Sequence, residues 1–232
     1  MAAQRVALIL GAGPNVGASV AAALASAGYK VVVASRRGTG ATTPEGYLSL
    51  QADFSKPESI PRVFDATKAA FNNAPNVVVY NAVSLTAPPD SNSALSIPVS
   101  SFEADLNVNT VSPYLAAQEA VKRWEALPGD LKKTFIYTGN GLNTAQLPNA
   151  AMLNLGVGKS ASAYWLAVAD INYASRGYRF FFADERTADG NFVYHDISGE
   201  AAAEFYTQLV RHEGYVPWQA TFVKGKGYVK FH

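Results

Sequence analysis

Residues 10–18 read Leu-Gly-Ala-Gly-Pro-Asn-Val-Gly-Ala and continue directly from the apolar run Val6–Leu10. That run is typical of a strand buried on both faces of a sheet, and Val16–Ala27 has the pattern of a helix. A strand, a glycine turn and a helix in succession aim free backbone N–H groups and the positive helix end at one point. The pattern favours a pyrophosphate-binding turn over a structural turn without a ligand. Its predicted binding residues are Gly11, Gly13, Asn15, Val16 and Gly17.

The turn departs from the spacing Gly-x-Gly-x-x-Gly, because position 16 is Val and the third glycine is Gly17. Asn15 stands between the last two glycines of the turn. Asparagine is among the few residues that tolerate a left-handed backbone. We therefore expect the turn to survive with an asparagine at this position.

Short apolar runs alternate with helical stretches along the chain. The predicted strands are Val6–Leu10, Val31–Ala34, Leu48–Gln51, Val77–Tyr80, Thr134–Thr138, Arg179–Ala183 and a last one in Gln219–Phe231. The predicted helices are Val16–Ala27, Pro57–Phe71, Phe102–Leu127, Gly158–Tyr173 and one from Ser198 to about Arg211. This alternation predicts an α/β fold with one domain over residues 1–232, a Rossmann-like doubly wound parallel sheet.

Several local signals refine this pattern. Gly28 follows the first helix where a left-handed cap is expected, and Ser55 with Glu58 matches a capping box for the second helix. His212 is expected to be a cation at a helix C-terminus. The Ser- and Pro-rich stretch Ser84–Ser101 follows the fourth strand, so it either covers a ligand cleft or is a plain surface loop.

Composition narrows the classes of partner. The formal net charge of the 232 residues is +1, which offers no electrostatic case for nucleic acid or an anionic membrane. The absence of cysteine excludes disulfides and thiolate chemistry, and the three histidines are too few and too scattered for a metal cluster. The first apolar run is too short for a signal peptide or membrane span. We expect a cytoplasmic protein with a small-molecule substrate and no metal.

The second predicted strand ends in Ala-Ser-Arg-Arg, where a site for NAD usually offers an acidic residue to the ribose 2′-hydroxyl. Ser35, Arg36 and Arg37 offer a hydroxyl and two guanidinium groups instead. These groups suit the 2′-phosphate of NADP(H). The alternative is a solvated pair of surface arginines.

Further motifs stand in a recognisable order. They are Asp53 and Phe54 in Gln-Ala-Asp-Phe, Asn81 and Ala82 in Asn-Ala-Val, Asn109 in Leu-Asn-Val-Asn-Thr, and Lys159 in Gly-Lys-Ser. With the glycine turn, the chain from Arg5 to about Ala183 resembles the short-chain dehydrogenase/reductase family. The resemblance implies that the Gln-Ala-Asp-Phe and Asn-Ala segments contact the cofactor. It also implies that Asn109 holds a water of the proton relay and that Lys159 holds the nicotinamide ribose, with its head group in a cleft.

The chain departs from the family at the proton donor. Residues 155–159 read Leu-Gly-Val-Gly-Lys where the family has Tyr-x-x-x-Lys, so the lysine is present and the tyrosine is absent. Leucine neither donates nor accepts a proton. Asn154, Tyr137 and Tyr164 are the nearest polar substitutes, but none stands at the required spacing.

The family's active-site serine is also missing from the segment after the fifth predicted strand, Tyr-Thr-Gly-Asn-Gly-Leu-Asn. Thr138 keeps a hydroxyl there, and Asn140 and Asn143 supply amides that can hydrogen-bond a substrate carbonyl. The alternative is that the asparagines only close a turn. We count Lys159, Asn109, Thr138, Asn140 and Asn143 among the candidate catalytic residues.

The sixth predicted strand ends in Asp184-Glu185-Arg186, where the family usually has a Pro-Gly turn. Open α/β sheets bind ligands at this edge. Asp184 is therefore a further catalytic candidate, as a general acid or base if burial raises its pKa, and a local ion-paired loop is the alternative. These departures resemble a divergent fungal-type branch of the family that lacks the active-site tyrosine.

Two classes of function remain open. The first is an atypical NADP(H)-dependent oxidoreductase that acts on a small carbonyl-bearing metabolite. The second is a non-redox enzyme, a cyclase or lyase, or a cofactor-binding pseudoenzyme on the same fold. The resemblance also implies a homodimer or homotetramer formed through the helices predicted at Phe102–Leu127 and Gly158–Tyr173.

Overall fold

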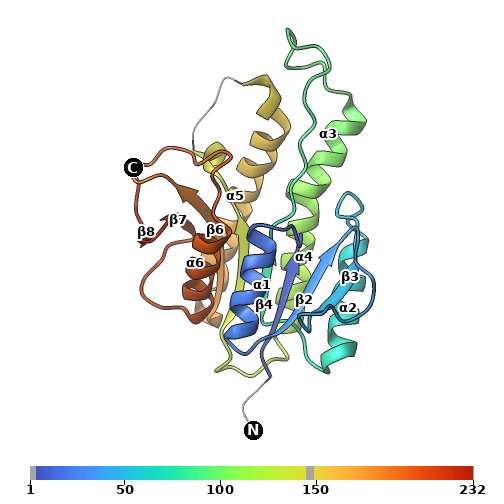
Figure 1. Cartoon of the computed structure of the whole chain (residues 1–232), viewed down its shortest axis with the longest axis vertical. Helices are drawn as coiled ribbons and strands as arrows, with labels where there is room; N and C mark the ends of the chain where they lie inside the picture. The colour runs from blue at the N-terminus through green and yellow to red at the C-terminus, as the bar shows by residue number, and fades with distance from the viewer. Residues whose placement is uncertain (1–3, 145–148, 232) are drawn as a thin grey trace.

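The computed structural model describes residues 4–144 and 149–231 (Figure 1). In these ranges the strands form one sheet in the order β3-β2-β1-β4-β5-β6-β7-β8. Their bounds are β1 Val6–Leu10, β2 Lys30–Ser35, β3 Leu48–Gln51, β4 Val77–Tyr80, β5 Lys133–Thr138, β6 Tyr178–Arg186, β7 Gln219–Val223 and β8 Gly227–Tyr228. All neighbouring pairs are parallel except β7 and β8. The predicted Rossmann-like doubly wound sheet is confirmed.

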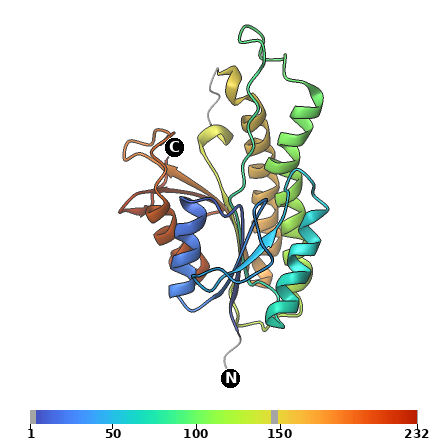
Figure 2. The ribbon, with the colours of Figure 1, turned by 45° about the vertical axis from the view of Figure 1, so that its right-hand side comes forward.

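Helices cover both faces of this sheet (Figure 2). They are α1 Val16–Ser26, α2 Ser59–Phe71, α3 Val99–Leu106, α4 Ser112–Trp124, α5 Leu153–Tyr173 and α6 Gly199–Arg211. One apolar core packs α1 and α6 against the sheet, and a second packs α2, α4 and α5 against its other face. The strands alternate their side chains between these two cores, which is why the central strands β1 and β4 are apolar throughout. No helix among the described residues is both long and apolar enough to cross a membrane.

Two predicted helices start earlier than expected. The predicted helix Gly158–Tyr173 begins at Leu153, so Leu155 and Lys159 lie on one helix. The predicted helix Phe102–Leu127 begins at Val99 and contains one turn of π-helix at Asn107–Val111. π-Turns inside α-helices are frequent at functional sites.

The capping box predicted at Ser55 and Glu58 is wrong. Helix α2 begins at Ser59, and Glu58 makes no capping hydrogen bond with its side chain. Ser55 instead donates from its backbone N and its Oγ to Oδ1 of Asp53, at 3.1 and 2.8 Å. The short Asp side chain competes for the serine and closes a turn before the helix. The left-handed cap predicted at Gly28 is confirmed by its φ of 85°.

The expectation that His212 is a cation is also wrong. His212 does end α6, but its Nε2 lies 3.0 Å from Oγ1 of Thr134. Burial, with the nearby charges of Lys132 and Arg179, lowers the pKa of His212 to about 4. The ring is therefore neutral at pH 7, and its hydrogen bond ties the end of α6 to β5.

The order of the strands brings the predicted site together. The chain moves outward from β1 to β3 on one side and then returns to the other side of β1 with β4. Ligands of open α/β sheets bind at such a switch point, beyond the carboxyl ends of the strands. The glycine turn after β1 and the segment after β4 consequently lie side by side at this edge.

Candidate active site

The glycine turn packs tightly against the segment after β4. Gly11 has a φ of 101°, and a Cβ on it would lie 2.3 Å from the backbone N of Ala82. Asn81 donates from Nδ2 to the carbonyl oxygen of Gly11 at 2.9 Å. A Cβ on Gly17 would lie 2.8 Å from that same oxygen. These two glycines are therefore required by the fold itself, through contacts within the chain.

Gly13 is different, because a Cβ built on it would meet no other atom within 4 Å. Packing within the chain does not explain a glycine at this position. A ligand that approaches the backbone closely does explain it, and Val16 begins helix α1 three residues later. The local geometry therefore fits the pyrophosphate of a dinucleotide.

Asn15 does not need the left-handed backbone that asparagine tolerates, since its φ is −95°. Its side chain instead joins the glycine turn to the start of α6. Nδ2 donates to the carbonyl oxygen of Ile197 and Oδ1 accepts from the backbone N of Gly199, both at 2.8 Å. The sequence did not predict this connection, because Ile197 and Gly199 lie 182 and 184 residues from Asn15 and no sequence motif links them.

The two arginines after β2 are exposed at the edge of the sheet. Ser35 accepts from the backbone N of Arg37 at 3.3 Å, and the carbonyl oxygen of Arg36 accepts from Gln51 at 3.2 Å. Within residues 4–144 and 149–231, neither guanidinium group takes part in an ion pair. Both are thus available to an anionic group.

Asp53 and Phe54 have different surroundings. The hydrogen bond from Ser55 lowers the pKa of Asp53, so its carboxylate is charged at pH 7. The ring of Phe54 is buried in the core, 5.7 Å from the ring centroid of Tyr80. The side chain of Phe54 therefore packs in the core and its carbonyl oxygen accepts from Ser112, so its expected cofactor contact stays a prediction for its backbone N.

Lys159 is buried, contrary to the expectation of a head group in a cleft. Its Nζ donates to the carbonyl oxygen of Thr138 at 2.7 Å and lies 4.3 Å from the ring centroid of Tyr137. Burial lowers the pKa of Lys159 to about 7, and the charge of Asp184 opposes this shift. The ammonium group thus exchanges its proton near neutral pH.

Asp184 is buried in the same region, where β6 ends beside β5. Its Oδ2 accepts from Nε of Arg186 at 2.7 Å, whereas Oδ1 has no hydrogen-bond partner within the described ranges. Burial raises the pKa of Asp184 to about 6, although Arg186 and Lys159 both lower it. The carboxyl group is thus ion-paired and also able to carry a proton near neutral pH.

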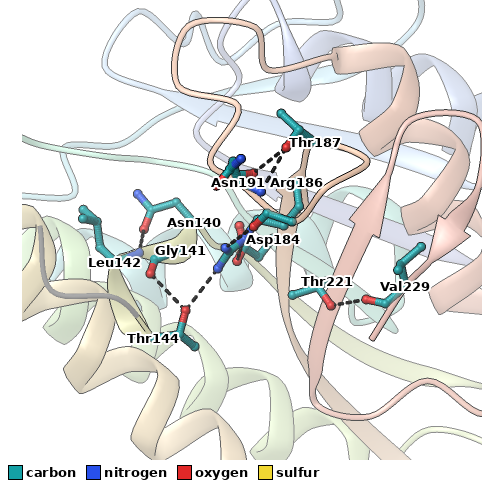
Figure 3. Close-up of polar contacts among 11 residues, drawn as sticks. Asn140, Gly141, Leu142, Thr144, Asp184, Arg186, Thr187, Asn191, Thr221 and Val229 are labelled. Carbon is teal, nitrogen blue, oxygen red and sulfur yellow. Dashed lines mark hydrogen bonds and ion pairs between the residues drawn. The ribbon is translucent and has the colours of Figure 1, made fainter. Parts of the chain in front are cut away.

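Arg186 connects this carboxylate to two neighbouring loops (Figure 3). Its Nη2 donates to Oγ1 of Thr144 at 3.1 Å and its Nη1 donates to the carbonyl oxygen of Gly190 at 3.0 Å. Its guanidinium carbon lies 4.9 Å from the ring centroid of Phe192. The same arginine therefore fixes the turn after β5 and the loop after β6.

The polar residues after β5 divide into two groups. Asn140 accepts from the backbone N of Leu142 at 3.1 Å, so it closes a turn, as the structural alternative predicted. Thr138 accepts from the hydroxyl of Tyr206 at 3.0 Å and stays partly exposed. Oδ1 of Asn143 is buried and lacks a partner among the described residues. Thr138 and Asn143 are the better candidates for contact with a substrate.

The side chain of Asn109 fixes the segment after β4. Its Oδ1 accepts from the backbone N of Ser84 at 3.1 Å, and its Nδ2 donates to the carbonyl oxygen of Ser84 at 2.8 Å. Its own carbonyl oxygen accepts from Tyr137 and Ser162, both at 2.8 Å. The amide and the carbonyl group of Asn109 thus hold three other segments together, and its expected contact with a water stays a prediction.

Leu155 lies one helical turn before Lys159 and faces the interior, with 8% of its surface exposed. The alternative donors lie elsewhere. Tyr164 points outward and is 76% exposed, and Tyr137 is buried with its hydroxyl bonded to Asn109. Neither tyrosine replaces the absent acid at position 155.

The raised pKa of Asp184 predicts a pH-dependent stability. Between about pH 4 and pH 6 the unfolded chain releases this proton and the folded chain keeps it, so the free energy of unfolding falls as pH rises. We expect Asp184→Asn to lack this fall, which amounts to about 3 kcal/mol at most. Urea denaturation at several pH values measures it, with the exposed Asp196→Asn as the control. Parallel profiles for wild type and Asp184→Asn would contradict the argument.

Comparison with known proteins places this geometry in a family. The family model for short chain dehydrogenases matches residues 5–130, more than half of the chain. A short chain dehydrogenase/reductase, dmxR12 of Cryptosporiopsis sp. (strain 8999), is 42% identical over 240 residues, covering 97% of this chain and 94% of that protein.

Solved structures agree on the fold. The 3-ketoacyl-(acyl-carrier-protein) reductase of Brucella melitensis, complexed with NADH, gives a TM-score of 0.77 at 19% identity, over 95% of this chain and 97% of that one. A metagenomic short-chain oxidoreductase in complex with NADP gives 0.73 at 17% identity, over 94% and 96%. The chain belongs to the short-chain dehydrogenase/reductase family.

Proposed function

We propose that this protein is an atypical NADP(H)-dependent reductase of a small carbonyl-bearing metabolite. The observation that carries the proposal is the pair of buried side chains Lys159 and Asp184 at the carboxyl edge of the sheet, where Lys159 donates to the carbonyl oxygen of Thr138. Both side chains exchange protons near neutral pH although position 155 holds no acid. Perturbed pKa values are frequent among catalytic groups, which favours an enzyme over a protein that only binds a ligand.

The residues present fit a dinucleotide. Gly13 leaves room for the pyrophosphate, and the free guanidinium groups of Arg36 and Arg37 suit a 2′-phosphate. We assign Asp53 to the adenine end of the cofactor, as the family resemblance implies. One neighbouring structure is a complex with NADP and another a complex with NADH, so the preference for NADP(H) rests on the two arginines.

NADPH bound here supplies a hydride to a carbonyl carbon. The chain must then deliver a proton to the carbonyl oxygen. Lys159 and Asp184 are the groups that can release one near pH 7, and Lys159 already contacts the carbonyl oxygen of Thr138. Thr138 and Asn143 offer polar atoms for holding the substrate.

A second candidate function follows from Leu155. We propose as the alternative a non-redox enzyme, a cyclase or lyase, or a cofactor-binding pseudoenzyme. It is favoured by the buried leucine in place of the acid, and by a lysine whose Nζ is bonded to the main chain. Under either proposal, the protein is a member of a divergent branch of the family that lacks the active-site tyrosine.

We also infer that two copies pair through α4 and α5. A groove of about 760 Å³ runs between these helices, lined by Tyr114, Val121, Tyr164, Trp165, Val168 and Tyr173. Tyr164 and Ile171 on α5 are 76% and 72% exposed. Large apolar side chains gathered along two helices mark an interaction surface.

The first prediction concerns the cofactor. Arg36→Ala with Arg37→Ala should weaken NADPH binding roughly tenfold or more and leave NADH binding little changed, because only the 2′-phosphate loses charged contacts. Fluorescence titration of both cofactors measures the two affinities. Arg211→Ala, an exposed arginine at the end of α6, is the control. Equal affinities for NADPH and NADH in the wild type would contradict the assignment.

The second prediction concerns the missing acid. Leu155→Tyr should raise the rate of NADPH-dependent reduction of simple ketones roughly tenfold to a hundredfold. We expect less than the full rate increase from general acid catalysis, because the new ring enters a buried position. Leu155→Phe adds the ring without the hydroxyl and should show no gain. NADPH oxidation is followed by absorbance. If adding Lys159→Met to Leu155→Tyr abolishes the increase in rate, the tyrosine and the lysine act in the same site. An equal increase in Leu155→Tyr and Leu155→Phe would exclude proton donation by the tyrosine.

The third prediction concerns assembly. Tyr164→Lys with Ile171→Lys should convert the dimer into a monomer, because two charges would be buried at the contact. Analytical ultracentrifugation measures the mass. Tyr215→Lys, at an equally exposed tyrosine outside these helices, should leave it unchanged. A wild-type protein that sediments as a monomer would refute this pairing.

A further inference from the structure

Asn15 stands at the start of one helix, but its side chain serves another. It is the N-cap residue of α1, a position where an asparagine side chain usually accepts from a backbone N–H of its own helix. The side chain of Asn15 makes no such bond to α1. Its Oδ1 accepts instead from the backbone N of Gly199, the first residue of α6, and its Nδ2 donates to the carbonyl oxygen of Ile197. The asparagine of the glycine turn thus caps α6.

The glycine at position 199 is fitted to this contact. A Cβ on Gly199 would lie 2.5 Å from Oδ1 of Asn15 and 2.5 Å from Oγ of Ser19 on α1. Gly199 is not among the residues with a positive φ, so its backbone conformation does not require a glycine. The close approach explains it, since α1 and α6 lie side by side on one face of the sheet (Figures 1 and 2). Asn15 and Gly199 therefore form a specific connection.

This connection lies at the end of the β6–α6 loop, residues 187–198, which packs against the candidate site. The ring of Phe192 in this loop leaves no room for a Cβ on Gly141 in the turn after β5. At the end of the loop, Oε2 of Glu185 on β6 accepts from the backbone N of Ser198 at 2.8 Å. The last residues of the loop therefore have two anchors, one on β6 and one in the glycine turn.

The two anchors differ in what a bound ligand can do to them. The glycine turn moves less when a pyrophosphate is bound to it, because releasing the turn would break the contacts with the ligand. Openings of the loop that carry Asn15 with them then become rarer, by at most about a hundredfold at a ligand concentration of about 100 times the dissociation constant. The anchor at Glu185 lies on a strand of the sheet, so openings that break it alone do not depend on the ligand.

We propose that Asn15 is a positioning residue that transmits the occupation of the glycine turn by a dinucleotide to the β6–α6 loop. Binding of the cofactor then fixes the loop on the substrate side before the substrate arrives. Because such coupling is reciprocal, a fixed loop also strengthens the binding of the cofactor. This proposal rests on the proposed function, since it specifies the regulation of the same site.

The test is hydrogen–deuterium exchange of the full chain, followed by mass spectrometry. It is carried out without ligand and with NADPH or NADH at about 100 times the dissociation constant. Peptides that contain residues 11–17 report the occupation of the glycine turn, and peptides that contain residues 193–199 report the loop. In the wild type, we expect the cofactor to slow exchange in both segments, and in the loop by roughly tenfold or more.

Two variants break the connection from opposite sides. Asn15→Gly removes both hydrogen bonds and leaves a residue that every turn accommodates. Gly199→Ala displaces the amide of Asn15 with its new Cβ and leaves the sequence of the glycine turn unchanged. In both variants, exchange in the loop should be faster without ligand and should respond to the cofactor less than about twofold. The cofactor should still slow exchange in the turn.

Two further variants serve as controls. Glu185→Ala removes the other anchor, so exchange in the loop should be faster without ligand, but the cofactor should still slow it. An anchor with a structural role alone is thereby distinguished from one that transmits occupation of the turn. Asn72→Gly, the same substitution at the exposed end of α2, should behave like the wild type.

A wild-type loop whose exchange the cofactor leaves unchanged would overturn the proposal. Slowing that survives in both Asn15→Gly and Gly199→Ala would also overturn it and indicate direct contact between cofactor and loop. If Asn15→Gly fails to fold or to bind the cofactor, Gly199→Ala decides.

The same experiment separates this inference from the proposed function. If neither NADPH nor NADH slows exchange in the glycine turn, the cofactor assignment fails and this inference fails with it. Slowing in the turn alone would reject only this inference. Slowing in both segments without oxidation of NADPH by any ketone would retain this inference and reject the reductase.

Discussion

The carbonyl oxygen of Asn109 accepts two buried hydrogen bonds, from Tyr137 on β5 and Ser162 on α5, and the site is built around this contact. A π-turn frees main-chain carbonyl groups that a regular helix would use, so such a turn requires donors from elsewhere. The hydroxyl of Tyr80 meets the same need at Val108. These bonds fix α5 against the sheet, and with it the positions of Leu155 and Lys159.

This arrangement explains why the lysine is buried. The ring of Tyr137, held by Asn109, lies beneath Nζ of Lys159, and the carbonyl oxygen of Thr138 accepts from it. A charge so removed from water requires a counter-ion, and Asp184 is the carboxylate that opposes the loss of its proton. Arg186 shares that carboxylate and extends the network to the loops on either side. The site thus holds buried charged groups although position 155 is a leucine.

Sequence patterns were sufficient to predict the central strands of the sheet, because a strand that is covered on both faces consists of apolar residues. Val77–Tyr80 and Val6–Leu10 were therefore found at their observed bounds. The glycine turn was recognisable since Gly11 has a positive φ and a Cβ on Gly17 would meet Gly11 and Ala12 of the same turn. Contacts between distant segments have no such signature. The partners of Asn15 and of Asn109 depend on how loops pack after the sheet has formed, and the burial that makes His212 neutral depends on packing against β5.

The same reasoning explains why residues at the carboxyl edge can vary while the fold is kept. Leu155 belongs to neither of the two apolar cores that pack the helices against the sheet, so its identity does not decide the fold. Asp105 makes a stronger demand on its surroundings, since a buried carboxylate is tolerated only with donors around it. Ser84, Thr86 and Asn154 supply those donors from two other segments.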